Sequence, residues 1–234
     1  MARLPRLCVP GQVHHVLWRG VTGQSVFVDN EDRGVFVEHL NQVATAHRLA
    51  LHAWALMPDH IHLLLTPQDA AGLSAGMQAL GRRHVQTFNR RHGRRGTLWE
   101  GRFRSTVLEA DPWLLRAMVW MDTHPQRVGM AVDVGQGHPW VSAGHYLGVQ
   151  SHRELTVPPQ YWALGNTPFA REAAYRTLLE HGCPWGHAQA LTRAALKGWV
   201  LGSDAFVAAL QSDTPRRLQP SRPGRPARGV VRQT

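Results

Sequence analysis

The stretch LHAWALMPDHIHLLLT, residues 51–66, decides how the chain is expected to fold. Its two apolar runs are separated only by Pro58-Asp59, a pair that favours a tight turn. The stretch therefore predicts two strands, 51–57 and 60–66, joined as a hairpin.

The second predicted strand begins with two histidines, His60 and His62. Side chains alternate between the two faces of a strand, so both imidazoles project from one face and could hold a cation between them. Two surface histidines beside a turn would give the same pattern, so the pair alone is weak evidence for a metal site. A third ligand would strengthen it, and His124 is a candidate; it could equally cap a helix C-terminus.

Outward from this hairpin, strands and helices alternate. Asp111 as N-cap and Pro112 at the first helical position predict the start of one helix, and Pro125 predicts its end near His124. The expected strands are 13–19, 51–57, 60–66 and 103–108, and the expected helices are 29–48, 73–88 and 111–124. This order predicts an α+β fold, a ferredoxin-like antiparallel sheet with helices on one face.

Three regions are expected along the chain. Residues 1–150 hold the predicted sheet domain, and residues 151–213 form a helical extension with helices near 171–180, 188–197 and 204–211. Residues 214–234 are rich in Arg, Pro and Gly and carry few large apolar side chains, so we expect a disordered basic tail.

The charge balance favours a polyanionic partner. The chain has 26 Lys+Arg against 16 Asp+Glu, a net charge of +10, and nearly all of the cations are arginine. Charge alone also fits membrane attraction or solubility. Without a long apolar run or a secretory signal, the protein is expected to be soluble and cytoplasmic, and the isolated Cys8 and Cys183 are expected to be reduced thiols.

Several short motifs together resemble one family. They are PGQVHHV at 10–16 followed by Arg19-Gly20, LMPDHIHLLL at 56–65, FNRRHG at 88–93, GRF at 101–103, PQRVG at 125–129 and the segment 139–148. In this combination the chain resembles the single-tyrosine HUH transposases, and in particular the REP-associated tyrosine transposases.

The resemblance implies a ferredoxin-like fold with the histidine pair on a central strand and a divalent cation, Mg²⁺ or Mn²⁺. His60 and His62 match the two HUH ligands, and His124 falls where an amide residue often completes the site. In the family, a tyrosine on a helix attacks a phosphodiester of single-stranded DNA, and the metal polarises the phosphate. The implied partner is single-stranded or hairpin DNA, and a homodimer is possible because family members act as dimers or monomers.

The chain departs from the family at the nucleophile. Trp120, four residues before His124, occupies the tyrosine position, and an indole cannot form a phosphodiester intermediate. Tyr146 aligns with a different family tyrosine and is kept as a substitute nucleophile. Three hypotheses stay open: DNA binding with weak or no cleavage, an active transposase or endonuclease using Tyr146 or metal-bound water, and a non-enzymatic module that binds protein or duplex DNA.

Arginines near two aromatic residues, Trp99 and Phe103, are the candidate DNA contacts, because such a mixture combines phosphate neutralisation with base stacking. Surface arginines beside core aromatics would look the same. The candidates are Arg82, Arg83, Arg90, Arg91, Arg94, Arg95, Arg102 and Arg104. In the tail, Arg225 lies in RPGRP at 222–226, which resembles an AT-hook core and could equally be a solubilising segment.

Overall fold

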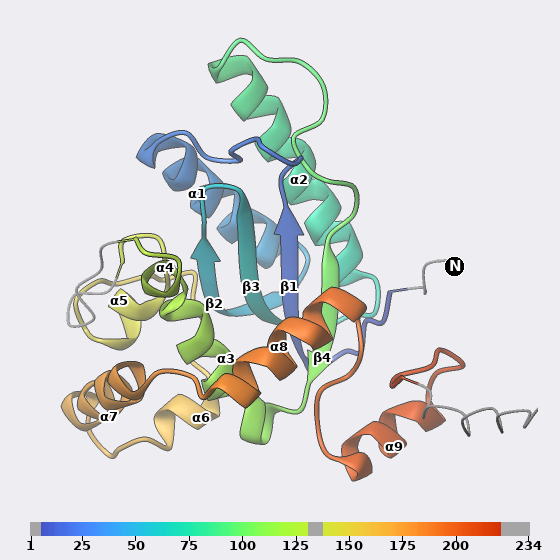
Figure 1. Ribbon diagram of the computed structural model, residues 1–234, viewed down its shortest axis with the longest axis vertical. Coiled ribbons are helices and arrows are strands. Elements are labelled where there is room, and N and C mark those ends of the chain that lie inside the picture. Colours follow the sequence, from blue (N-terminus) through green and yellow to red (C-terminus); the bar gives the residue numbers. More distant parts are fainter. Residues whose placement is uncertain (1–5, 131–137, 221–234) are drawn as a thin grey trace, which may run out of the picture.

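A four-stranded antiparallel sheet lies at the centre of the described residues, 6–130 and 138–220, of the computed structural model (Figure 1). The strands are β1 (Val13–Arg19), β2 (Leu49–Leu56), β3 (His60–Pro67) and β4 (Arg104–Leu108). They pair in the order β2-β3-β1-β4. The expected α+β, ferredoxin-like arrangement is confirmed.

The predicted hairpin joins β2 and β3. The Met57 amide donates to the His60 carbonyl at 2.9 Å, which closes the turn around Pro58-Asp59. In the register of the sheet, His62 lies opposite Leu17 of β1 and Ala55 of β2. The histidine pair is therefore on a central strand, as the sequence predicted.

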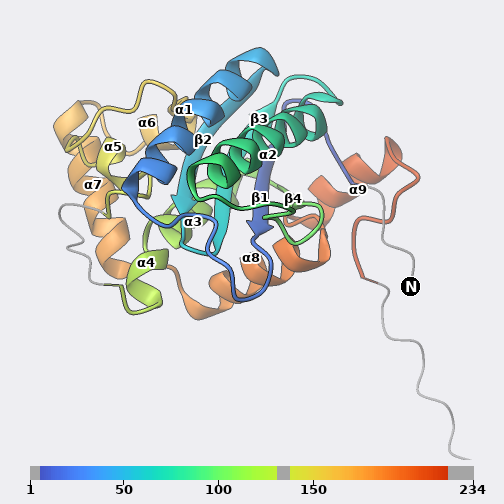
Figure 2. The same ribbon diagram turned by 90° about the horizontal axis from the view of Figure 1, so that it is seen from above.

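Two helices, α1 (Asn30–Ala46) and α2 (Gly72–Arg91), cover one face of the sheet (Figure 2). At the start of α1, the Asp29 side chain accepts a hydrogen bond from the Asp32 amide and caps the helix. Gly81 allows α2 to approach the sheet, because a Cβ there would lie 2.2 Å from the Trp18 ring. Helix α2 extends past its expected end at residue 88, and residues 89–91 form its last turn.

The opposite face is covered by α3 (Ala110–Asp122) and α8 (Trp185–Lys197), so helices lie on both sides of the sheet and not, as expected, on one face only (Figure 2). The backbone of α3 is non-helical at Asp111, and regular helix follows from Pro112, as the Asp-Pro pair predicted. Helix α3 ends at Asp122, two residues before the expected end near His124. Pro125 has no amide hydrogen for the carbonyl four residues earlier, and a separate short helix α4 (His124–Arg127) follows Thr123.

The remaining described helices are α5 (Ala143–Tyr146), α6 (Pro159–Trp162), α7 (Pro168–His181) and α9 (Asp204–Ser212). Helix α7 is tied to α3 by the Tyr175 hydroxyl, which donates to a buried Asp122 carboxylate oxygen at 2.7 Å. Leu218, in the segment expected to be a disordered tail, is fully buried in a cluster with Val107 and Leu210. The rest of that tail, 221–234, lies outside the described residues.

The division into domains at about residue 150 stays a prediction. Tyr175 of α7 and Leu191 of α8 are fully buried in the same hydrophobic cluster as the sheet residues.

Among the described residues, none of the helices combines the length and apolar character needed to span a bilayer.

Candidate metal and DNA-binding site

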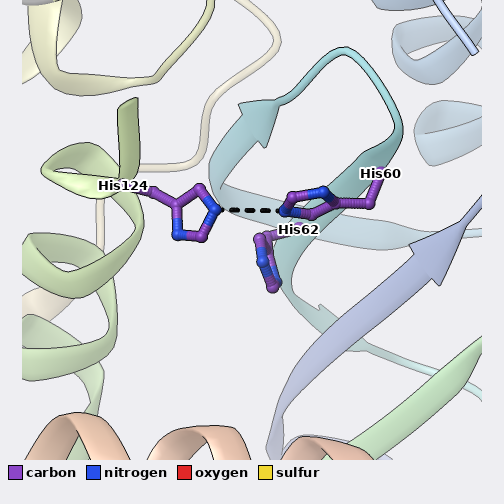
Figure 3. Close-up of side chains that lie close together, drawn as sticks. All are labelled: His60, His62 and His124. Atoms are coloured by element: carbon purple, nitrogen blue, oxygen red, sulfur yellow. Dashed lines mark hydrogen bonds between the residues drawn. The ribbon is translucent and has the colours of Figure 1, made fainter. Parts of the chain in front are cut away.

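Three histidines meet at the edge between the sheet and α4 (Figure 3). His60 and His62 come from β3, and His124 is the first residue of α4. One ring nitrogen from each lies within 4.8 Å of the others, and the Nε2 atoms of His60 and His124 are 3.1 Å apart. The fold thus brings together the three histidines that the sequence analysis named as candidate metal ligands.

The carboxylate of Asp59 orients His60. Its Oδ1 atom lies 2.6 Å from His60 Nδ1, and an ionised carboxylate accepts only, so Nδ1 carries the proton. His60 Nε2 then carries no proton, and its lone pair points into the cluster. This carboxylate–histidine arrangement is the usual support for a metal-binding imidazole.

Arg127 orients His124 differently. One terminal nitrogen of its guanidinium donates to His124 Nδ1 at 2.9 Å, and a guanidinium has no acceptor. The single proton of neutral His124 is therefore on Nε2, where it faces the lone pair of His60. The direction of hydrogen bonding runs consistently from Arg127 through His124 and His60 to Asp59.

His62 is buried behind the other two histidines. Its Nδ1 lies 2.9 Å from Nε2 of His15, a fully buried residue of β1 whose own Nδ1 has no hydrogen-bond partner among the described residues. If His62 donates to His15, its Nε2 is free to bind a metal. Sequence reasoning assigned no role to His15, because its contact with His62 depends on the register between β1 and β3.

Burial keeps these imidazoles neutral. It lowers the pKa of His124 to about 3 and that of His15 to about 4, and the pKa of His62 falls well below its ordinary value. For His60 the same burial lowers the pKa, while Asp59 opposes the shift. Neutral imidazole is the form that binds a metal.

Trp120 packs directly on this cluster. Its ring centroid lies 5.5 Å from that of His15, 4.9 Å from that of His62 and 5.7 Å from that of His124. The position predicted for a nucleophile therefore adjoins the histidines, and the side chain there is an indole. Its ring is buried, and the guanidinium of Arg127 lies 5.0 Å from its centroid.

Tyr146 does not adjoin the cluster. It is fully buried on α5, its hydroxyl donates to the His52 carbonyl, and burial raises its pKa well above the ordinary value. The chain's other tyrosines, Tyr161 and Tyr175, are also buried and hydrogen-bonded. This geometry contradicts the expectation that Tyr146 could replace the nucleophile.

Some of the predicted DNA-binding arginines have other partners. Arg91 forms ion pairs with three carboxylates at the start of α1, those of Asp29, Glu31 and Asp32. Three other predicted arginines donate hydrogen bonds to neutral acceptors within the protein: Arg83 to Gln42, Arg94 to Gln24 and Arg104 to the Leu196 carbonyl. Arg91 in particular is unsuited to phosphate binding, because its charge is already compensated.

Arg82 and Arg102 line a pocket of about 1090 Å³ between α2 and the segment before β4. Trp18, Trp99 and Phe103 form its aromatic wall, and the rings of Trp18 and Trp99 stack with centroids 4.4 Å apart. Trp18 was not among the sequence candidates, since its strand looked purely structural.

The other predicted contacts lie elsewhere. Arg90 and Arg95 are exposed near the end of α2 and in the loop after it. Arg225 lies outside the described residues. Only Arg82 and Arg102, of the predicted set within the described residues, line the aromatic pocket.

The sheet region of the chain matches a known protein family. Residues 8–113 match the model of the IS200-like transposase family. That match includes His60 and His62 and ends before Trp120 and His124. Among curated proteins no match is found.

Two solved structures are similar to the chain. One is a REP-associated tyrosine transposase bound to a REP hairpin, with a TM-score of 0.54 and 13% identity, covering 68% of this chain and 99% of that one. The other is a putative transposase from Deinococcus radiodurans R1, with a TM-score of 0.36 and 28% identity, covering 50% and 95%. The first supports the fold. Over residues 8–113 the chain is therefore similar to the IS200-like transposase family.

Proposed function

We propose that this DNA-binding transposase-family protein recognises single-stranded or hairpin DNA at a divalent-metal site on His60 and His62, without tyrosine-dependent cleavage. The observation that carries the proposal is the packing of Trp120 against the histidine cluster. An indole has no oxygen that can attack phosphorus. The cluster can then bind and orient a phosphodiester without forming a covalent intermediate.

The two β3 histidines fit a cation, whereas His124 does not fit in its present hydrogen-bonding state. The contact with Asp59 leaves His60 Nε2 unprotonated and able to bind a metal. The contact with His15 allows His62 Nε2 to be unprotonated as well. Mg²⁺ and Mn²⁺ are the expected ions, and imidazole donors favour Mn²⁺ over Mg²⁺. A cation bound there would polarise a phosphate of the DNA.

The aromatic pocket lies on the α2 face of the sheet, opposite the histidine cluster on the α3 face, and is proposed as a second, separate DNA contact. Arg82 and Arg102 would neutralise phosphates, and the edges of Trp18, Trp99 and Phe103 would contact an unpaired base. The fold's similarity to a transposase solved with a REP hairpin supports a hairpin as the DNA class.

Binding to labelled single strands, hairpins and duplexes of matched sequence tests this proposal. Fluorescence anisotropy with a pool of hairpin sequences should show tighter binding to hairpins and single strands than to duplex, strengthened by Mn²⁺. The Mn²⁺ effect should disappear in His60→Ala/His62→Ala and persist in His47→Ala, a histidine at the end of α1. Equal affinity for duplex, or no response to Mn²⁺, would contradict the proposal.

A further inference from the structure

Arg127 is hydrogen-bonded to His124, the third histidine of the cluster. Its guanidinium donates to His124 Nδ1 at 2.9 Å, and to the Trp120 carbonyl and the Thr123 hydroxyl at 2.6 Å each. The residue is nevertheless exposed. Its hydrogen-bond partners among the described residues are all neutral, and none of them is a carboxylate.

The proton on His124 conflicts with metal binding. A metal needs a lone pair on Nε2, and neutral imidazole can provide it only by moving the proton to Nδ1. That would place an N–H of His124 against an N–H of Arg127. While Arg127 keeps this contact, only His60 and His62 can act as ligands, although the three nitrogens lie within 4.8 Å.

A phosphate offers Arg127 a better acceptor than the imidazole. Guanidinium and phosphate form charge-assisted, often bidentate hydrogen bonds, which are roughly twice as strong as neutral ones. A DNA phosphate beside the histidines would therefore draw Arg127 away from His124 Nδ1. The freed Nδ1 could then hold the proton, and Nε2 would become a ligand.

We propose that Arg127 holds His124 out of the metal site until a DNA phosphate takes over the guanidinium, so that metal and DNA bind cooperatively. The inference rests on the proposed metal site at His60 and His62. By linkage, DNA raises the affinity for metal by the same factor as metal raises the affinity for DNA.

The test is a double-mutant cycle on metal affinity, measured by Co²⁺ absorption and Mn²⁺ calorimetry without DNA. Arg127→Gln should raise the affinity about tenfold, because the amide oxygen can accept from His124 Nδ1 and favour the metal-binding tautomer. Arg127→Met should raise it less. His124→Ala should change wild-type affinity less than twofold and should abolish the gain in the Arg127→Gln background. Arg116→Met, which removes an arginine of α3 that donates to the Pro112 carbonyl, is the matched control.

Two further measurements make the test specific. The ¹⁵N shifts of the His124 ring should show protonated Nε2 in the wild type and protonated Nδ1 in Arg127→Gln. A hairpin oligonucleotide should raise wild-type Mn²⁺ affinity more than that of Arg127→Gln.

The outcomes separate the inference from the proposed function. A wild type that binds Co²⁺ and loses more than tenfold affinity in His124→Ala would overturn the role of Arg127 alone. No Co²⁺ binding by any variant would overturn both the metal site and this inference. Thermal unfolding of each variant shows whether it is folded.

Discussion

The indole of Trp120 meets the imidazole of His62 edge to face, with ring centroids 4.9 Å apart. Trp120 is also in contact with His15 and His124, so one aromatic ring covers the histidines on the α3 side. The residue that removes the expected nucleophile thereby becomes part of the packing that holds the cluster.

Replacing Trp120 should reveal this packing role. Trp120→Ala should lower the free energy of unfolding by about 3–5 kcal/mol, because it leaves a cavity beside three rings. Trp120→Phe should cost less, since the smaller ring keeps part of the contact. Chemical denaturation measures both, and equal stability of Trp120→Ala and wild type would contradict the packing role.

Asp59 should support metal binding through His60. Asp59→Ala removes the carboxylate 2.6 Å from His60 Nδ1 and should weaken Mn²⁺ binding about tenfold or more. Asp69→Ala, an exposed carboxylate near Arg48, is the control and should leave the affinity unchanged. Calorimetric titration with Mn²⁺ measures the affinity of both variants. Equal losses of Mn²⁺ affinity in the two variants would show a general charge effect and contradict the role of Asp59.

His84 should make the fold sensitive to acid. Burial lowers its pKa from 6.5 to about 4, and its Nε2 donates to the Val26 carbonyl at 2.8 Å. A depressed folded-state pKa means that its stabilisation is complete above pH 6.5 and is lost as the pH falls toward 4, by about 3 kcal/mol at most.

His84→Gln keeps an N–H donor but no longer titrates in this range. The difference in unfolding free energy between pH 7 and pH 5 should therefore be smaller than in the wild type. Urea denaturation at the two pH values checks this, and an unchanged difference would assign the acid sensitivity to other groups.

Arg82 and Arg102 should contribute to the salt dependence of DNA binding. Each alanine substitution should reduce the slope of log affinity against log salt concentration by about 0.7 for a single strand. Arg91→Ala should leave that slope unchanged, because Arg91 pairs with Asp29, Glu31 and Asp32. Anisotropy titrations at several salt concentrations measure the slopes; a large effect of Arg91 alone would reverse this assignment.

The sequence was sufficient for the sheet and for the histidine pair. Pro58-Asp59 between two apolar runs defined the hairpin, and strand alternation placed His60 and His62 on one face. Both conclusions depend on local geometry, which neighbouring residues determine.

The contacts between distant segments could not be predicted. His15 and His62 are 47 residues apart, and only the register of β1 against β3 brings them together. The same holds for Arg91, which the sequence placed at the DNA interface. The end of α2 lies beside the start of α1, and this packing places Arg91 against the acidic residues there.

Covalent capture of DNA is the most direct test of the central claim that the site binds DNA without a tyrosine nucleophile. Labelled single-stranded hairpins would be incubated with Mn²⁺ and resolved on a denaturing gel. The wild type should give neither cleavage nor adduct, whereas Trp120→Tyr should gain a 5′-phosphotyrosine adduct that requires His60 and His62. Cleavage by the wild type, with or without an adduct, would contradict the account.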